Sequence, residues 1–352
     1  MKSMINKREM YFDYLRIFAI LGVIGIHVVG INWFDTNVKS LSWQVLNVYS
    51  SMCRYCVPIF VMISGALFLN QSKKLDIKKL YLKNILRLFI ALVFWSLVYA
   101  VFSNIIMTRS FNMSILKDTI KMFLSGYYHL WYIPMMIGLY IVVPMFKKIC
   151  EDKKIEEYFL IIFLIFTTLI PFLAKVPKLD IILGSGIFST SVAMVSGFAG
   201  YFVLGHYLDT YILPKKYEIT IYVLGVLSLL FTIVSTAVFS IYKGFAFDAF
   251  YDSLTINNTI YIVAIFIFFK YHVGKIKLSD NIKNIIVKIS NLIFGVYLIH
   301  NIFIALLIKF NIVSSSLICS LLCPLFIILV LLLSLICSFI ISKIPILNKY
   351  II

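Results

Sequence analysis

Long apolar runs recur from one end of this sequence to the other, and each is about as long as a helix that crosses a bilayer. Hydrophobic residues make up 62% of the chain and charged residues 13%, whereas a soluble domain holds roughly 45–50% and about 25%. Inside a bilayer the backbone must satisfy its own hydrogen bonds, which runs of this length do as helices. The runs predict an all-α, polytopic membrane bundle with ten helices, at 11–31, 45–69, 84–106, 129–147, 157–174, 190–208, 217–240, 256–271, 289–308 and 317–341.

The basic residues are divided unevenly between the two sides of such a bundle. If the N-terminus lies inside, 22 of the 32 Lys and Arg residues fall in inner segments and 8 in outer ones, which favours an N-in, C-in topology. The net charge of +17 then reflects topology and contact with anionic lipids, and no nucleic-acid partner is expected.

We expect one integral-membrane domain over 1–352 with short cytoplasmic tails at 1–10 and 342–352. The longest outer loop, 107–128, has room for a small amphipathic stretch.

Two residues in the first predicted helix constrain the function most. Arg16 precedes His27 by eleven residues, and eleven steps of 100° place the two side chains about 20° apart around the axis and about 16 Å apart along it. An ionisable side chain among lipid tails costs several kcal/mol, so the helix is expected to turn both toward protein or a polar cavity. That geometry suits a long substrate with a charged head.

Further charged residues lie at the same two depths. Arg54, in the second helix, is expected at the level of His27, either as a cation beside a buried base or as a side chain that snorkels to the interface. Asp13 lies three residues before Arg16 and can pair with it. That pair is either structural or leaves Arg16 able to bind phosphate as well, to which a guanidinium offers a fork of donors. Arg87 either adds positive charge at the inner level or is an ordinary membrane anchor.

Other candidate residues favour structural roles. The six cysteines form no disulfide framework, and Cys53-x-x-Cys56 lacks a second pair of ligands, so no metal site is expected. Ser64 and Gly65 fit a close contact between helices. His206 and His272 are expected to be solvated or interfacial.

Four short motifs resemble those of the acyltransferase-3 family of membrane O-acyltransferases. They are Asp13-x-x-Arg16 with ten residues before His27, Val57-Pro-Ile-Phe-Val-Met-Ile-Ser-Gly65, His129-Leu-Trp-Tyr132 and Gly295-Val-Tyr-Leu-Ile-His300. They occur in the family's order, and the likeness runs from about residue 10 to 305.

The resemblance implies transfer of an acyl group, usually acetyl, from cytosolic acyl-CoA to a hydroxyl of a cell-envelope or lipid-linked carbohydrate. It implies that His27 is catalytic and that Arg16 contacts acyl-CoA. The family also has an Arg-x-x-Arg pair at the start of the third helix, where this chain has Asn84 and Arg87. Only the second arginine matches, although Asn84 can still donate hydrogen bonds. Acetyl-CoA is then a donor substrate and no cofactor is permanently bound.

The Arg16–His27 spacing agrees with that activity. The pantetheine arm of coenzyme A is on the order of 15–20 Å long, close to the separation along the helix. We hypothesise that His27 is the general base for the acceptor hydroxyl, with a covalent acyl-imidazole as an open variant. Arg54, or a helix amide, is the candidate for stabilising the oxyanion.

The later motifs contain four further candidate residues. His129 and Trp131 can contact a sugar or belong to an aromatic belt at the membrane surface. Tyr297 and His300 can line the cavity opposite His27. The expected partners are acyl-CoA, a carbohydrate acceptor and membrane lipids, in a bacterial plasma membrane, with the oligomeric state open.

The leading alternative is an exporter or flippase for polysaccharide or its lipid-linked precursor, since intramembrane arginines and histidines also suit a transport path. The Arg16–His27 spacing favours the enzyme because it fits one donor molecule. Helix-breaking pairs at matching places in two halves, expected of many transporters, are not evident. A structural or sensor protein explains the buried charges least well.

Overall fold

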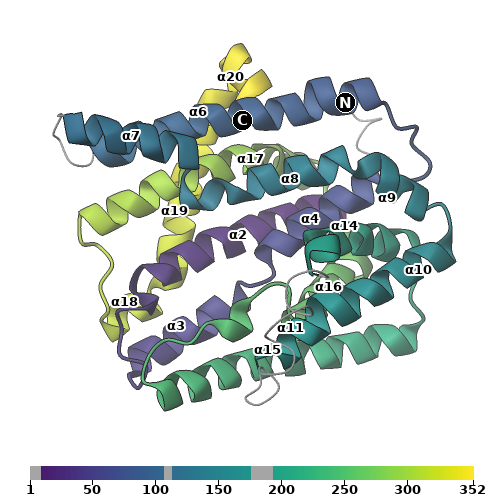
Figure 1. Cartoon of the computed structure of the whole chain (residues 1–352), viewed down its shortest axis with the longest axis horizontal. Coiled ribbons are helices and arrows are strands. Elements are labelled where there is room, and N and C mark those ends of the chain that lie inside the picture. Colours follow the sequence, from purple (N-terminus) through teal and green to yellow (C-terminus); the bar gives the residue numbers. More distant parts are fainter. Residues whose placement is uncertain (1–8, 107–112, 176–192) are drawn as a thin grey trace. The chain divides into compact units, whose positions relative to one another are not determined.

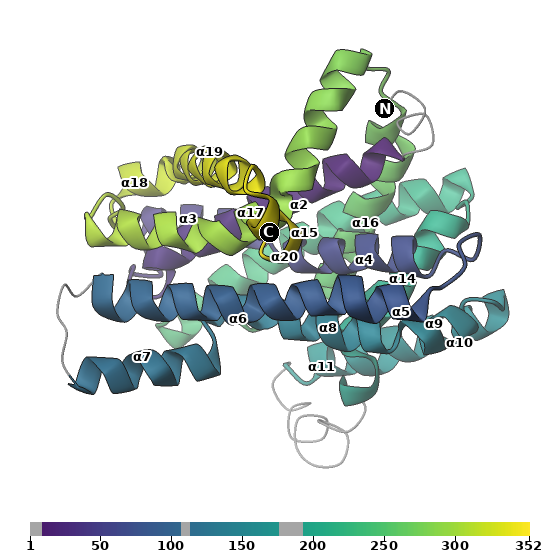
Figure 2. The same ribbon diagram turned by 90° about the horizontal axis from the view of Figure 1, so that it is seen from above.

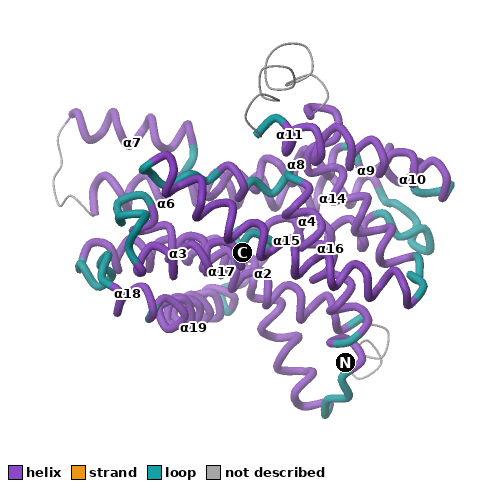
Figure 3. Tube along the Cα trace, turned by 90° about the horizontal axis from the view of Figure 1, so that it is seen from below, coloured by secondary structure: helices purple, strands orange, loops and turns teal. Residues whose placement is uncertain are grey.

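The computed structural model describes residues 9–106, 113–175 and 193–352, and within these ranges the chain is helical with no strand (Figure 3). The α-helices are α2 (Met10–Trp33), α3 (Leu41–Met52), α4 (Cys56–Phe68), α5 (Ile77–Lys79), α6 (Leu86–Val101), α7 (Met113–Ser125), α8 (Tyr132–Ile141), α9 (Val143–Ile149), α10 (Lys153–Ile162), α11 (Ile170–Leu173), α14 (Ala193–Thr210), α15 (Lys215–Lys243), α16 (Ile256–Tyr271), α17 (Asp280–Lys309), α18 (Leu317–Leu321), α19 (Cys323–Ser342) and α20 (Pro345–Tyr350). Wider π-helical turns occur at η1 (Leu80–Ile85), η2 (Phe102–Ile106) and η4 (Phe163–Leu169), and 3₁₀ turns at η3 (Tyr128–Trp131), η5 (Ala249–Tyr251) and η6 (Val273–Lys275).

The fold class predicted from the apolar runs is confirmed. In the described ranges eight helices are long and apolar enough to cross a membrane, and nine if α7–α8 and α9, which meet at a bend of 58°, form one span. The sixth expected run, 190–208, begins outside the described residues. Its remainder forms α14, which is interrupted at Gly197, where φ is 22° and ψ is −131°. The chain is therefore an all-α, polytopic membrane bundle.

Three helices expected to be continuous are broken, each just before a proline. The run at 45–69 divides at Cys53–Tyr55, before Pro58; the run at 129–147 bends at Val142, before Pro144; and the run at 317–341 breaks at Leu322, before Pro324. Proline has no amide hydrogen for the carbonyl four residues earlier and its ring crowds that carbonyl, so an uninterrupted helix is disfavoured there. Our expectation of single unbroken helices was wrong at these points.

The described residues form two compact units. Unit 1 comprises those of Met1–Ser72, Met145–Asn291 and Ser314–Ile328, and unit 2 those of Lys73–Pro144, Leu292–Val313 and Leu329–Ile352. Each unit therefore combines segments that are far apart in the sequence.

In unit 1, α4 packs closely against α14, and α2 packs against α3 and α4 (Figure 1). A Cβ atom added to Gly65 of α4 would lie 1.7 Å from the carbonyl oxygen of Phe202, and one added to Gly205 of α14 would lie 2.1 Å from that of Met62. The two backbones approach this closely only because glycine stands at both positions. The helix contact predicted at Gly65 is confirmed.

In unit 2, α6 packs against α7, α8 and α20 (Figure 2). Helix α7 lies in the 107–128 loop, where an amphipathic stretch was expected; residues 107–112 lie outside the described ranges. The segment expected to be a C-terminal tail instead forms α20, and Ile351 and Ile352 are buried beyond it. The indole Nε1 of Trp95 donates a hydrogen bond to the Ile351 carbonyl at 3.1 Å, so α6 holds the end of this segment.

Candidate active site

The first candidate pair lies near the start of α2 in unit 1. Asp13 is fully buried, and Nη1 of Arg16 donates to its Oδ1 at 3.2 Å, with a quarter of the Arg16 side chain exposed. The i, i+3 pairing predicted from the sequence is confirmed. A buried carboxylate needs a partner of this kind.

The second pair lies toward the other end of unit 1's α2. His27 is partly exposed and lines a pocket of about 250 Å³ together with Arg54, Ser50, Asp248 and Tyr251. Because α2 is continuous from Met10 to Trp33, Arg16 and His27 share one rigid helix and lie about 16 Å apart along it. The structure thus brings His27 and Arg54 to one pocket, as their depths suggested.

The turn between α3 and α4 positions Arg54. Its Nε–H donates to the carbonyl oxygen of Ser50 at 3.1 Å, Nη2 donates to the Ser50 hydroxyl, and the guanidinium carbon lies 3.9 Å from the centre of the Tyr251 ring. A guanidinium over an aromatic face is attracted by the ring's negative face. These contacts hold the head group against protein, which does not fit the interpretation that Arg54 simply snorkels to the interface.

Sequence reasoning missed two residues of this pocket. Tyr251 belongs to the short turn η5 and its hydroxyl donates to Asn47, while Asp248 precedes the same turn. Asp248 is exposed and brings a carboxylate to the pocket that holds the Arg54 guanidinium. Both residues are about 200 positions from Arg54, and no local motif marks them.

A larger pocket of about 890 Å³ lies at the N-terminal end of α2 in unit 1. Tyr11 and Tyr14 line it from α2, and five lysines and one histidine line it from elsewhere: Lys215, Lys270, Lys275, Lys277, Lys283 and His272. Arg16 is not among its lining residues, because it points to a different side of α2 from Tyr14. Glu9 and Glu218 also line the pocket, and Glu218 pairs with Lys215 at 2.7 Å. The lysines outnumber these two carboxylates, which favours anions over cations.

In unit 2, Asn84 lies in the π-helical turn η1, and Arg87 follows in the first turn of α6. Arg87 donates through Nη2 to the backbone oxygen of Ile352, and its guanidinium carbon is 5.6 Å from the centre of the Phe294 ring. Asn84 and Arg87 are therefore neighbours in one structural unit, as the motif predicts. Arg16 belongs to the other unit.

The histidines and the tyrosine of the two later motifs meet in a second cluster in unit 2. The His129 ring is buried, and its centre lies 5.2 Å from the centre of the His300 ring and 5.7 Å from the centre of the Tyr297 ring. The Tyr297 hydroxyl donates to the His129 carbonyl at 2.7 Å, and His300 Nδ1 lies 2.6 Å from the Tyr297 carbonyl. His300 has no exposed surface, so it lies in a packed aromatic cluster.

Trp131 lies on another surface of unit 2. It is 48% exposed and lines a pocket of about 420 Å³ that also includes Tyr127, Tyr128, Ser96 and Ser125. An exposed indole beside hydroxyl groups fits both interpretations of this motif, an aromatic belt and a sugar contact.

The two remaining histidines differ from each other in burial. The His272 side chain is 45% exposed and its Nε2 lies 2.9 Å from Glu218, which agrees with an interfacial position. His206, which we also expected to be solvated or interfacial, is only 1% exposed, and that expectation was wrong. The C-terminal turns of an apolar helix do not reveal which face packs against a neighbour.

A family described as an acyltransferase domain, acyltransferase family 3, matches residues 10–343, nearly the whole chain. No curated protein and no solved structure matches this chain. The match includes both helices that form the His27 pocket, and it favours an enzyme over an exporter. The chain belongs to the acyltransferase-3 family and is a multi-pass membrane acyltransferase.

Proposed function

We propose that this protein transfers an acyl group, usually acetyl, from cytosolic acyl-CoA to a hydroxyl of a cell-envelope or lipid-linked carbohydrate in a bacterial plasma membrane. The observation that carries the proposal is the arrangement on α2: His27 shares a pocket with Arg54, and the Asp13–Arg16 pair lies about 16 Å away along the same helix.

Arg16 is the anchor for the donor in this proposal. Its guanidinium binds a phosphate of coenzyme A while Asp13 holds it in place. With the N-terminus in the cytosol, the pantetheine arm then extends along α2 toward His27. The length of that arm, on the order of 15–20 Å, matches the rise of eleven helical residues.

His27 is the general base. Its neutral imidazole takes the proton of the acceptor hydroxyl as the oxygen attacks the thioester carbonyl carbon. The tetrahedral intermediate carries its negative charge on the former carbonyl oxygen, next to the Arg54 guanidinium. The intermediate collapses as the carbon–sulfur bond breaks, and the coenzyme A thiolate takes the proton from the imidazolium.

The size of the His27 pocket supports these separate roles for Arg16 as donor anchor and His27 as base. At about 250 Å³, it is smaller than pockets that enclose a whole drug-sized ligand. It therefore suits the reacting ends of two substrates whose remaining parts bind elsewhere. The polar side chains of Ser50, Asp248 and Tyr251 suit a sugar hydroxyl.

The test separates donor binding from transfer. His27→Ala is expected to bind acetyl-CoA as the unaltered protein does and to lose transfer by about 10²–10⁴-fold, the usual contribution of a general base. Arg16→Ala is expected to weaken acetyl-CoA binding, as measured by calorimetry in detergent. Lys39→Ala, an exposed cation in the α2–α3 loop, is the control. Full transfer by His27→Ala contradicts the catalytic assignment, and unchanged donor affinity in Arg16→Ala contradicts only the anchor.

A further inference from the structure

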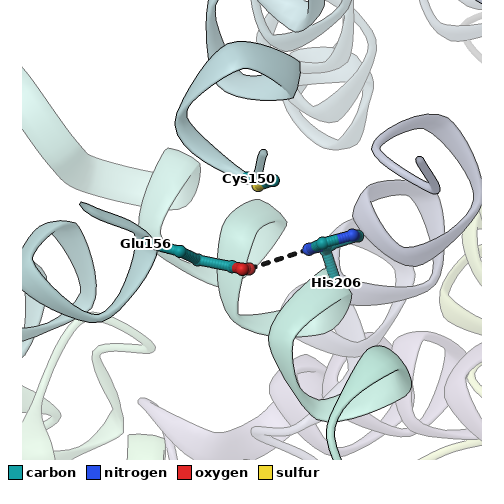
Figure 4. A group of neighbouring side chains, drawn as sticks. All are labelled: Cys150, Glu156 and His206. Atoms are coloured by element: carbon teal, nitrogen blue, oxygen red, sulfur yellow. Dashed lines mark hydrogen bonds and ion pairs between the residues drawn. The ribbon is translucent and has the colours of Figure 1, made fainter. Parts of the chain in front are cut away.

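A thiol, a carboxylate and an imidazole converge inside unit 1, away from the His27 pocket. Cys150 follows the last turn of α9, Glu156 lies in the first turn of α10, and His206 lies near the C-terminal end of α14 (Figure 4). One candidate ligand atom from each, the Cys150 sulfur, a Glu156 carboxylate oxygen and a His206 ring nitrogen, lies within 4.8 Å of the others. Among the described residues, no other three His, Cys, Asp or Glu side chains bring candidate metal-ligand atoms this close together.

All three side chains are buried. Cys150 is 3% exposed, His206 1% and Glu156 not at all. Nδ1 of His206 lies 2.8 Å from Oε1 of Glu156, but the second carboxylate oxygen, Oε2, is buried with no hydrogen-bond donor in the described structure. A buried carboxylate oxygen without a partner is costly, so this position calls for a positive ligand.

We propose that Cys150, Glu156 and His206 bind a zinc ion. Thiolate, imidazole and carboxylate are the ligand types that Zn²⁺ takes in proteins, at about 2.3 Å for sulfur, 2.0–2.1 Å for nitrogen and 2.0–2.2 Å for oxygen. Tetrahedral angles and those bond lengths place the ligand atoms roughly 3.3–3.6 Å from one another. The separations between these atoms, from 2.8 Å to no more than 4.8 Å, span that range, so small side-chain shifts bring the three ligands to tetrahedral positions around the ion.

Charge and tautomer agree with the same ligand. A thiolate and a carboxylate together neutralise the two charges of the ion, which suits a site shielded from water. Nε2 of His206 lies 3.2 Å from the Thr210 hydroxyl. With the proton on Nε2 donated to Thr210, Nδ1 turns its lone pair toward Glu156, as a second partner fixes the tautomer of metal-binding histidines.

Other roles for the cluster explain less. A catalytic cysteine is partly exposed and ionises easily, whereas the Cys150 thiol is buried. Burial, the negative charge of Glu156 and a hydrogen bond to the Glu156 side chain raise the pKa of this thiol. A purely structural link is also unnecessary, because the Tyr207 hydroxyl already joins α14 to α10 by donating to Glu157 at 2.8 Å.

The experiment measures metal in the full-length protein, purified in detergent without chelator or histidine tag. Mass spectrometry of the metal content is expected to find about one zinc per chain. Cys150→Ser and Glu156→Gln are expected to retain less than a tenth of that zinc. Cys56→Ser, at another buried cysteine, and Glu157→Gln, at the adjacent glutamate, are the matched controls and are expected to keep it.

Cobalt provides a second readout that does not depend on transferase activity. After zinc is removed with a chelator, Co²⁺ is expected to bind with a thiolate-to-cobalt charge-transfer band in the near ultraviolet, which Cys150→Ser abolishes. Comparison is restricted to variants that remain monodisperse, so misfolding does not imitate metal loss. Zinc below a tenth of an equivalent together with no cobalt band in the unaltered protein overturns the proposal, and so does equal zinc in all four variants.

Discussion

Arg54 is fixed in place before any substrate arrives. Its guanidinium lies on the Tyr251 ring and is held by Ser50, one helical turn earlier in the chain. A donor that is already oriented stabilises a developing negative charge without reorganisation at the moment of reaction. Within the described residues, the hydrogen bonds of Arg54 use Nε and Nη2, which leaves Nη1 for the oxyanion.

This arrangement predicts a selective defect in Arg54→Gln. Transfer is expected to fall by about 10²–10³-fold, the usual cost of removing one oxyanion donor, while acetyl-CoA binding stays the same because the anchor at Arg16 is intact. Steady-state kinetics and calorimetry on the same preparation measure both quantities. Lys39→Gln controls for a lost positive charge, and a proportional loss of donor affinity in Arg54→Gln contradicts the assignment.

Two cysteines of unit 1 are expected to differ in reactivity. The hydroxyls of Ser314 and Ser316 lower the pKa of the Cys319 thiol, whereas Cys150 is buried and inaccessible to a reagent in water. A lowered pKa means that the thiolate forms at lower pH. Alkylation of Cys319 is therefore expected to reach its plateau at a lower pH than alkylation of any unperturbed thiol, and Cys150 is expected to react last.

Iodoacetamide labelling at a series of pH values, read by peptide mass spectrometry, measures this order. Ser314→Ala removes the hydroxyl that donates to Cys319 Sγ at 3.3 Å and is expected to move the Cys319 profile toward higher pH. An unchanged profile in that variant shows that the serine does not set the pKa.

Residues of the site were predictable where spacing along one helix, or depth in the membrane, determines their positions. The Asp13–Arg16 pair follows from i, i+3 spacing, and the His27–Arg54 neighbourhood follows from the depth of two adjacent helices. Tyr251 escaped prediction because it reaches the pocket through tertiary packing alone. The burial of His206 depends on which side of α14 faces α10, and spacing along the sequence does not encode that choice.

At the scale of elements, the contact between α4 and α14 is the tightest described in unit 1. Gly65→Ala and Gly205→Ala each place a methyl group against backbone atoms of the other helix, which cannot move as a side chain does. Each is expected to destabilise the protein by about 1–3 kcal/mol, as overpacking does.

Thermal unfolding in detergent measures this effect as a lower midpoint. Gly138→Ala, at an exposed position of α8 with no atom within 4 Å of the added carbon, is expected to leave the midpoint unchanged or slightly higher. A midpoint for Gly65→Ala equal to that of Gly138→Ala rules out the close backbone contact.

The lengths of the elements were more predictable than their continuity. Hydropathy located every long span in the described ranges, because about 20 apolar residues are needed to cross a bilayer. It missed the breaks before Pro58, Pro144 and Pro324, since one proline among about 20 residues changes the average hydropathy little. The break before Pro58 is also the turn that positions Arg54. A helix break that average hydropathy does not reveal therefore contributes to the candidate site.

At the scale of the whole molecule, the membrane orientation remains a prediction from the basic residues. With both ends in the cytosol, the α17–α18 connection lies outside. In intact cells a membrane-impermeant maleimide is expected to label a variant whose only cysteine is Cys319. A cysteine-free protein carrying Lys349→Cys is expected to react only after the membrane is permeabilised. The opposite order of labelling would mean that the bundle is inverted.

Unit 1's α2 has one more consequence for how a donor is selected. Because no break interrupts it between Met10 and Trp33, the distance from Arg16 to His27 cannot adapt to the substrate. In the proposed reaction, a carrier must therefore match this fixed separation at both ends. Acyl phosphates and short thioesters are too short to contact Arg16 and His27 together, so in the proposed reaction the length of the carrier is a criterion of specificity.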